Sequence, residues 1–306
     1  MERGMTTRVL YIAGQAYSGS TVLCALLGVH PDLEPVSELA MWTLKAERTH
    51  RYCACGRSRL ECPFWTVVHR TWLDSLGPLT VGSYAGLQSR IETIRYTWPQ
   101  MFSRMPWQHP EEMQAYRRGT LALYRSVTAA SGRSVVVDSS KKPGRAVAIT
   151  GADGLDLRII HLVRNGLSFV EAHLRRGVLS PTGTNYLYGV FRLGMAWSAV
   201  NYAAERALSM TGSKGLRLRF EDLLQNPIPS LQSIGAHIDL DTECIQEHVQ
   251  AGLPISWRHI ESGSRHRMGG PAVLDPSFLK YRQLDGRTRL AFQLGGGVLS
   301  RRYGYQ

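Results

Sequence analysis

Residues 9–27, VLYIAGQAYSGSTVLCALL, constrain the fold of this chain more than any other stretch. The apolar, β-branched and aromatic run at residues 9–13 predicts a buried strand, and the apolar residues after Thr21 predict a helix. Between them, Gly14 and Gly19 bracket a turn, called the phosphate loop below, whose backbone can approach a ligand closely. The new helix offers free N–H groups and a positive dipole end to that turn, which is the arrangement of an anion site. A turn before a core helix, with no ligand, is the alternative interpretation.

Three hydroxyl side chains belong to this turn: Ser18, Ser20 and Thr21. The spacing is close to a nucleotide-binding P-loop, Gly-x4-Gly-Lys-Ser/Thr, but Ser20 stands where that motif has its lysine. A kinase or ATPase without this lysine loses the cation that meets the β- and γ-phosphates. The loop therefore favours a phosphate-bearing ligand other than an ordinary nucleoside triphosphate.

The chain is basic, with 36 Lys and Arg against 24 Asp and Glu and a net charge of +12. Such an excess indicates acidic partners, which are nucleic acid, a membrane surface or a polyanionic small molecule. The basic residues are scattered along all 306 residues, so we expect one basic pocket among solvated faces and no nucleic-acid partner. This length suits one large α/β domain, or two small ones.

No apolar run reaches the roughly 18 residues that span a bilayer, so we expect no integral membrane segment. The first residues lead straight into the predicted strand and leave no room for a signal peptide. We therefore expect a cytoplasmic protein with reduced cysteines. The five cysteines are Cys24, Cys53, Cys55, Cys62 and Cys244.

Residues 28–39 contain two prolines and scattered polar residues, which predict a loop. It leaves the same strand end as the phosphate loop, so its side chains can return over a bound ligand. Glu34 and Glu38 lie in it, and a glutamate beside an anion site is a candidate general base. A solvated loop carboxylate is the alternative interpretation for both.

Residues 53–65, CACGRSRLECPFW, predict a compact loop. Its three cysteines are candidate zinc ligands together with His50 or His69, but they lack the usual paired Cys-x2-4-Cys spacing. We expect a packed, thiol-rich loop and no zinc.

Residues 80–130 combine helical spacing with many aromatic side chains. We expect these to be mainly core, with a few lining an acceptor pocket.

Two more apolar runs predict strands that end in charged residues. Residues 134–138 end in Asp138, which resembles the magnesium-binding aspartate of a P-loop NTPase, and Lys141 follows at the presumed crevice edge. Residues 157–163 lead into Arg164, whose guanidinium suits bidentate contact with a phosphate. An ordinary surface arginine is the alternative interpretation.

The remaining chain predicts a helix at residues 186–210, a strand at 216–220, a helix ending near Gly252 and a final helical tail. Residues 257–270, called the late loop below, are basic and glycine-rich, and suit closure over an anion. Strands that alternate with helices indicate a parallel sheet covered on both faces.

Taken in order, these segments resemble the sulfotransferase family that uses 3′-phosphoadenosine 5′-phosphosulfate (PAPS), most closely its bacterial branch. The family's 5′-phosphosulfate loop is similar to residues 18–21, and its 3′-phosphate segment is similar to residues 163–166, Val-Arg-Asn-Gly. The glutamate of its Gly/Ser-Glu loop falls on Glu38. Further matches are CACGRSRLECPFW, VDSSK, RFEDL, His259 with Gly263 and Arg267, and the RYGY ending. The resemblance implies a single three-layer, P-loop-like α/β domain over residues 1–306, with a central parallel sheet flanked by helices.

Three departures from the family pattern stand out. Tyr17 replaces the Lys or Arg that the family places before Ser-Gly, and Lys141 is our candidate for the missing cation. Ala172 stands where the 3′-phosphate serine is expected, and Ser168 lies one turn earlier on the same helix face. Residues 264–265, Ser-Arg, replace the usual Asn-Pro of the late loop.

The resemblance implies in-line transfer of a sulfuryl group from PAPS to a hydroxyl of a sugar, phenol, nucleoside or lipid, leaving adenosine 3′,5′-bisphosphate (PAP). Glu38 would accept the proton of the acceptor, and Lys141 would offset charge on the leaving oxygen. No metal is required, since fixed dipoles and cations can supply the electrostatic stabilisation. The implied donor-binding residues are Tyr17, Ser18, Gly19, Ser20, Thr21, Arg164, Ser168 and Arg267.

Two other functions stay open from the sequence. One is a P-loop small-molecule kinase or NTPase with Asp138 on magnesium. The other is a nucleic-acid-binding module, argued from the net charge of +12 alone. A homodimer is likewise left open beside a monomer.

Overall fold

Five parallel strands form the centre of the computed structural model, which describes residues 6–44, 52–103, 105–181, 183–211, 215–279 and 284–305. The strand order is β2-β3-β1-β4-β5. The strands are β1 (Thr7–Ala13), β2 (Leu33–Ser37), β3 (Val135–Lys141), β4 (Leu155–Val163) and β5 (Gly215–Arg219). The central strand β1 is therefore the one that leads into the phosphate loop, and β3 and β4 pair with it on either side.

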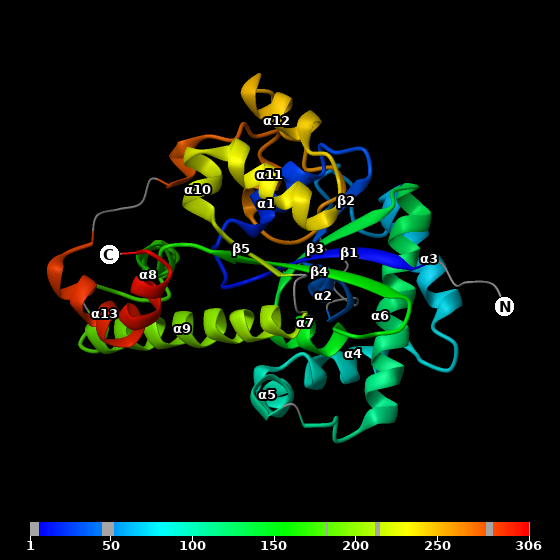
Figure 1. Ribbon diagram of the computed structural model, residues 1–306, viewed down its shortest axis with the longest axis horizontal. Coiled ribbons are helices and arrows are strands. Elements are labelled where there is room, and N and C mark those ends of the chain that lie inside the picture. The colour runs from blue at the N-terminus through cyan, green and yellow to red at the C-terminus, as the bar shows by residue number, and fades with distance from the viewer. Residues whose placement is uncertain are drawn as a thin grey trace.

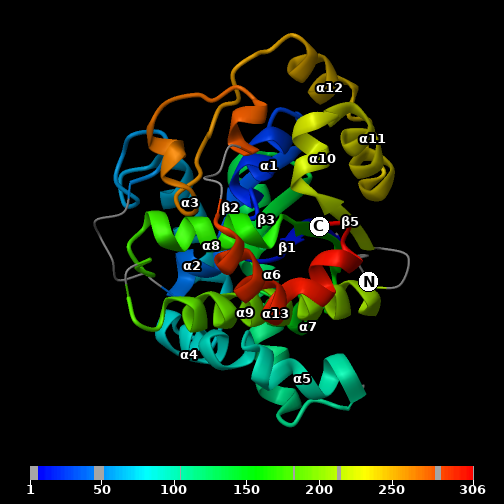
Figure 2. The ribbon, with the colours of Figure 1, turned by 90° about the vertical axis from the view of Figure 1, so that its left-hand side faces the viewer.

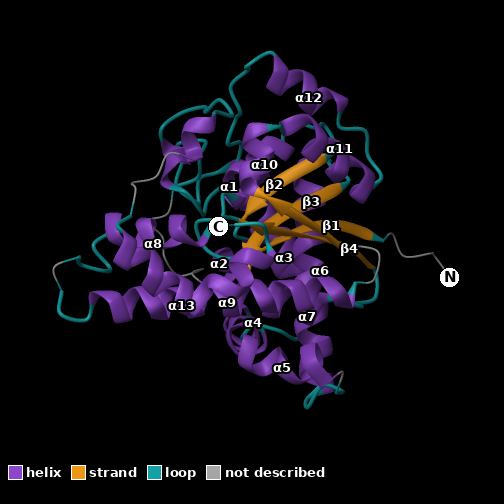
Figure 3. Ribbon diagram, turned by 60° about the vertical axis from the view of Figure 1, so that its left-hand side comes forward, coloured by secondary structure: helices purple, strands orange, loops and turns teal. Residues whose placement is uncertain are grey.

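Helices cover both faces of this sheet (Figures 1 and 3). One face carries α1 (Ser20–Leu27), α10 (Phe220–Gln225), α11 (Pro227–Ile238) and α12 (Glu243–Gln250). The other carries α2 (Leu39–Leu44), α3 (Pro63–Ser75), α4 (Val81–Ile91), α5 (Ile94–Ser103), α6 (Pro110–Ser131), α7 (Pro143–Ile149) and α9 (Tyr186–Met210). The three-layer α/β arrangement expected from the sequence is confirmed.

Alternation along β1 explains the two-sided core, because successive side chains of a strand point to opposite faces. Val9 and Tyr11 pack with α3, α6 and α7, whereas Leu10 and Ile12 pack with α1 and α11. All four side chains are buried. A strand with both faces buried is the expected form in a parallel sheet.

A third apolar cluster lies beyond the carboxyl end of the sheet. It joins α8 (Gly166–Arg175), α9 and α13 (Gly286–Arg302), which come forward together in Figure 2. Phe292 of α13 packs edge-on against Trp197 of α9. A Cβ on Gly166 would lie only 2.0 Å from the Phe292 ring, so glycine is needed where α8 begins.

The predicted strands at residues 9–13, 134–138, 157–163 and 216–220 are confirmed, and α9 matches the predicted helix. The loop prediction for residues 28–39 is wrong in part, since β2 forms within it and pairs with β3. Pro35 is tolerated because β2 is an edge strand, where one missing N–H is not needed by a second neighbour.

The helix predicted to end near Gly252 is three helices: α10, α11 and α12. Pro227 begins α11 at its first turn, and Asp239 ends it in a left-handed conformation with φ of 53°. Proline at the start and a left-handed residue at the end are ordinary helix boundaries.

A buried ion network fixes the helical segment at residues 80–130 to the sheet. Arg145 of α7 is fully buried and donates to Glu92 Oε1 at 2.5 Å and to Asp138 Oδ2 at 3.3 Å. Tyr116 and Tyr124 of α6 donate their hydroxyls to the same two carboxylates, each at 2.8 Å. The network therefore joins α6, α7 and the segment between α4 and α5 to β3.

Two short 3₁₀ turns, η1 (Arg265–Met268) and η2 (Pro276–Leu279), lie in the segment before α13. Within the described ranges, the helices are too short or too polar for any of them to pass through a lipid bilayer.

Candidate functional site

The carboxyl ends of three neighbouring strands bring the predicted site segments together. Ala13 at the end of β1 pairs with Lys141 of β3 and with His161 of β4. The next residue, Gly14, donates its N–H to the main-chain oxygen of Lys141 at 3.0 Å. In an open parallel sheet this edge is where ligands bind.

The phosphate loop needs glycine at both of its ends. Gly14 has φ of 150°, and a Cβ there would lie 2.4 Å from the main-chain oxygen of Leu162. Gly19 has φ of 89°, and a Cβ there would lie 2.2 Å from the Phe220 ring. Gly19 is also the N-cap of α1, so the first N–H groups of that helix open onto the loop.

Two buried serine hydroxyls, one in the loop and one on α8, have no partners among the described residues. Ser18 is 3% exposed and Ser168 of α8 is 5% exposed, and neither Oγ has a hydrogen-bond partner among the described residues. Leaving a buried hydroxyl unsatisfied costs about 1–3 kcal/mol. Both hydroxyls are therefore available to donate a hydrogen bond.

Arg164 lies between the loop and α10. It follows β4, and its Nη1 donates to the main-chain oxygen of Tyr17 at 3.3 Å. Its guanidinium lies over the Phe220 ring, 5.0 Å from the centroid. Burial lowers the pKa of Arg164. The arginine is thus held beside the phosphate loop, with Phe220 as a shared support for Arg164 and Gly19.

Glu38 and Lys141 form an ion pair in which Lys141 Nζ donates to Glu38 Oε1. Their side chains are 20% and 17% exposed, so the pair is partly accessible to solvent. Lys141 has φ of 68°, an uncommon conformation for a residue with a side chain. The two residues predicted as base and cation, from segments 103 positions apart, therefore meet at one place.

The late loop contacts the start of α1 through Gly263 and Ser264. Ser264 donates its N–H to Thr21 Oγ1 at 3.2 Å. A Cβ on Gly263, which has φ of 103°, would lie 2.5 Å from the same Oγ1 and 3.0 Å from Ser37 Oγ. Arg267 donates to the main-chain oxygens of Glu261, at 2.6 Å, and Tyr52, at 3.2 Å. Its role in donor binding stays a prediction.

The side chain of Tyr17 packs against α8 and is half-buried. Its ring lies 6.0 Å from that of Phe169 and 5.5 Å from that of His173. The guanidinium of Arg176 lies over the Tyr17 ring at 4.9 Å. Neither Arg176 nor Phe220 was predicted as a site residue, although Phe220 lies in the RFEDL segment.

The remaining candidate carboxylates have other partners. Asp138 is fully buried, and its two oxygens accept hydrogen bonds from Tyr124, Arg145 and the main-chain N–H and hydroxyl of Ser140. It is therefore part of the core network rather than a magnesium ligand at the crevice. Glu34 is also buried, and it faces Arg133 and Arg258.

A cavity of about 470 Å³ lies beside β5 and α11. Its lining includes Arg217, Arg219 and Arg302. Of the described residues that we predicted for the site, none lines this cavity. The candidate site is therefore defined by side-chain and backbone geometry at the strand ends.

No protein-family model and no curated protein matches this sequence. Solved structures do match its fold. The sulfotransferase domain of the Synechococcus PCC 7002 olefin synthase aligns with a TM-score of 0.54 and 16% identity, covering 100% of this chain and 98% of that one. The sulfotransferase domain of the curacin biosynthetic pathway gives 0.50 and 16%, covering 99% of each chain.

Sulfotransferase STF9 from Mycobacterium avium gives a TM-score of 0.50 and 12% identity, covering 98% of this chain and 78% of that one. These likenesses show that the chain has the fold seen in bacterial sulfotransferases, as the sequence motifs indicated.

Proposed function

We propose that this protein is a sulfotransferase that moves a sulfuryl group from PAPS to a hydroxyl of a small-molecule acceptor. The observation that carries the proposal is the pair of buried hydroxyls of Ser18 and Ser168, which lack partners among the described residues. Ser18 follows Tyr17, whose main-chain oxygen accepts a hydrogen bond from Arg164, and Ser168 lies in the first turn of the helix that follows Arg164. A donor with phosphates at both its 5′ and 3′ positions gives each hydroxyl an acceptor. The fold shared with sulfotransferases supports the same reaction.

In this proposal the donor is held by its two phosphates. The N–H groups of residues 17–21 and the hydroxyls of Ser18 and Thr21 bind the 5′-phosphate, aided by the dipole of α1. Arg164, Ser168 and Arg267 bind the 3′-phosphate, which distinguishes this donor from ATP. The guanidinium of Arg164 suits this task because it is already fixed beside the loop by Tyr17.

The transfer step uses the Glu38–Lys141 pair. Glu38 takes the proton of the acceptor hydroxyl as that oxygen bonds to sulfur, and the bond from sulfur to the bridging phosphate oxygen breaks. PAP leaves with the electron pair on that oxygen. Protonation removes the negative charge of Glu38, which frees the ammonium of Lys141 to meet the charge on the leaving oxygen. The ion pair thus couples acceptor activation to leaving-group stabilisation.

Thermal unfolding with nucleotides tests the donor assignment. At a hundredfold excess over its dissociation constant, a ligand adds about 2.7 kcal/mol of stability. For a chain of 306 residues, that is a rise of about 4 °C in Tm. We expect this rise with PAP, and little or none with 5′-AMP or with ATP and magnesium. A rise with ATP and magnesium alone contradicts the proposal and favours a kinase.

Serine variants sharpen this test. Ser168→Ala should reduce the rise with PAP because it removes one contact to the 3′-phosphate. Ser126→Ala is the matched control, since Ser126 is also a buried helical serine but donates to the main-chain oxygen of Ala122. Equal rises in both variants would remove Ser168 from the donor site.

A further inference from the structure

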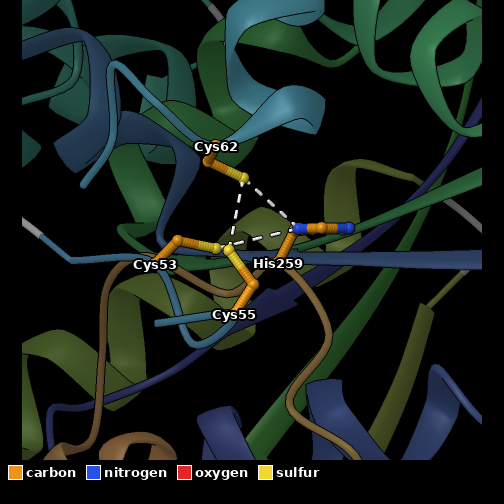
Figure 4. Close-up of side chains that lie close together, drawn as sticks. All are labelled: Cys53, Cys55, Cys62 and His259. Carbon is orange, nitrogen blue, oxygen red and sulfur yellow. Dashed lines mark hydrogen bonds between the residues drawn. The ribbon is translucent and has the colours of Figure 1, made fainter. Parts of the chain in front are cut away.

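Three cysteines and one histidine point their ligand atoms toward a common centre outside the phosphate site (Figure 4). Cys53, Cys55, Cys62 and His259 place their sulfur and nitrogen atoms within 4.8 Å of one another. His69, a candidate ligand from the sequence, instead packs edge-on against Trp42, and His50 lies outside the described residues. Among the described residues, this is the one group of three or more such side chains close enough to hold a metal ion.

Three of the distances between these ligand atoms are close to those of a tetrahedral zinc site. With bonds of about 2.3 Å to sulfur and 2.0–2.1 Å to nitrogen, tetrahedral ligands lie about 3.5–3.8 Å apart. The distance from Cys55 Sγ to Cys62 Sγ is 3.6 Å. The distances from His259 Nδ1 to Cys62 Sγ and to Cys53 Sγ are 3.3 and 3.8 Å. With all four ligand atoms within 4.8 Å of one another, the cluster has room for one ion at its centre.

Local backbone structure holds the cysteines in this arrangement. The N–H of Cys53 donates to the oxygen of Arg57 at 2.9 Å, and the N–H of Gly56 donates back to the oxygen of Cys53 at 2.9 Å. Gly56 has φ of 84°, and nothing lies within 4 Å of a Cβ placed there, so it serves the turn alone. This tight turn directs two cysteines of one short segment to the same side.

His259 is held by the same segment. The indole N–H of Trp65 donates to the main-chain oxygen of His259 at 2.7 Å. The ring of Phe64 stacks on the imidazole at 4.9 Å, with an angle of 11° between the planes. The N–H of Ala54 donates to the oxygen of Ile260 at 3.0 Å. The imidazole is thus oriented before any ion binds.

We propose that Cys53, Cys55, Cys62 and His259 bind one structural zinc ion, which joins the loop at residues 53–62 to the late loop. Four protein ligands leave no open position for a substrate or water, which is the mark of a structural site. Four positions after His259, Gly263 packs against Thr21 of the phosphate loop. The ion therefore fixes the segment that covers the donor site, and it takes no part in the transfer chemistry.

Metal analysis of the purified full-length chain tests this inference without any assay of activity. We expect about one zinc per chain by inductively coupled plasma mass spectrometry. Cys62→Ser and His259→Asn should lose the metal. Cys244→Ser is the matched control, because Cys244 is a free, exposed cysteine on α12 outside the cluster, and it should keep the metal.

Cobalt replacement on the unaltered chain covers the case in which the variants do not fold. Tetrahedral cobalt bound by thiolates gives strong visible d–d bands and sulfur-to-metal charge-transfer bands. Their appearance on addition of Co²⁺ to the reduced, metal-free chain, and their loss on addition of Zn²⁺, supports the site. A chain that takes up neither ion with its thiols reduced overturns it.

A disulfide is the competing use of these cysteines. A bond between Cys55 and Cys62 would lower the mass of the intact, non-reduced chain by two hydrogens. The proposal would be refuted if the unaltered chain showed this lower mass and if Cys62→Ser contained as much zinc as the unaltered chain. Because these readouts do not involve donor or acceptor, they succeed or fail independently of the proposed sulfotransferase activity.

Discussion

Replacing Gly19 with alanine tests how tightly the phosphate loop is built. The substitution has two separate costs. The first is conformational, because φ is 89° and ψ is 6° at this residue, and a left-handed conformation costs a residue with a Cβ about 1–2 kcal/mol. The second is steric, because the new Cβ would lie 2.2, 2.4 and 2.5 Å from three carbons of the Phe220 ring.

The ring of Phe220 has little room to move away. It is 1% exposed and lies under the guanidinium of Arg164. Overpacking of this kind costs about 1–3 kcal/mol. We therefore expect Gly19→Ala to lower the free energy of unfolding by about 2–5 kcal/mol, which combines both costs.

Urea denaturation, followed by circular dichroism, measures this loss against a matched control. Gly252 has φ of 61°, and nothing lies within 4 Å of a Cβ placed there, so Gly252→Ala carries the conformational cost alone, about 1–2 kcal/mol. Phe220→Leu in the Gly19→Ala background should relieve the steric part, with an interaction energy of about 0.5–3 kcal/mol. If Gly19→Ala costs no more than Gly252→Ala and Phe220→Leu gives no relief, the packing argument is refuted.

Three further predictions concern the base, the core and pH. Glu38→Gln should lower kcat by about 10²–10⁴-fold while leaving the stabilisation by PAP intact, and a variant with unaltered turnover would exclude Glu38 as the base. Arg145→Met should lower the free energy of unfolding by about 3–5 kcal/mol, because two buried carboxylates lose their shared cation; a loss below 1 kcal/mol in urea denaturation would contradict this. His161 is fully buried, and burial lowers its pKa to about 4. Between pH 6.5 and 4 its imidazole is therefore neutral in the folded protein but protonated in the unfolded chain, where its pKa is about 6.5. As the pH is lowered from 6.5 to 4, this residue should reduce the free energy of unfolding by about 3 kcal/mol, measured by urea denaturation at each pH. If the free energy of unfolding of a His161→Gln variant falls with pH just as steeply, another group is responsible.

The strand ends were predictable because their signals are local. Residues 9–13 form one apolar run, and the glycine-bracketed turn follows directly. β1, the loop and α1 could therefore be predicted from neighbouring residues. Arg164 and Lys141 follow similar runs, and parallel strands place such ends at one edge of a sheet. Local pattern and general sheet geometry were sufficient there.

The features that could not be predicted from the sequence depend on contacts between segments that are far apart in the chain. β2 escaped prediction because Pro35 signals a loop, and only its place at the edge of the sheet makes a strand acceptable. His259 lies 197 residues from Cys62, so the spacing rules for local zinc motifs could not pair them. Nor could the sequence show that Phe220 supports both Gly19 and Arg164, since that contact exists only once α10 packs on the loop.

The strand order has a consequence for how the chain is made. β1 leaves the ribosome before the other described strands, yet its two neighbours in the sheet, β3 and β4, are synthesised much later. The hydroxyl of Tyr11 in β1 donates to the main-chain oxygen of Lys142, 131 residues further along. At about 5–20 residues per second, the central strand waits roughly 7–26 s for that partner. During that interval β1 lacks both of the strands that pair with its edges in the folded sheet, so the sheet is completed from its centre outward only late in synthesis.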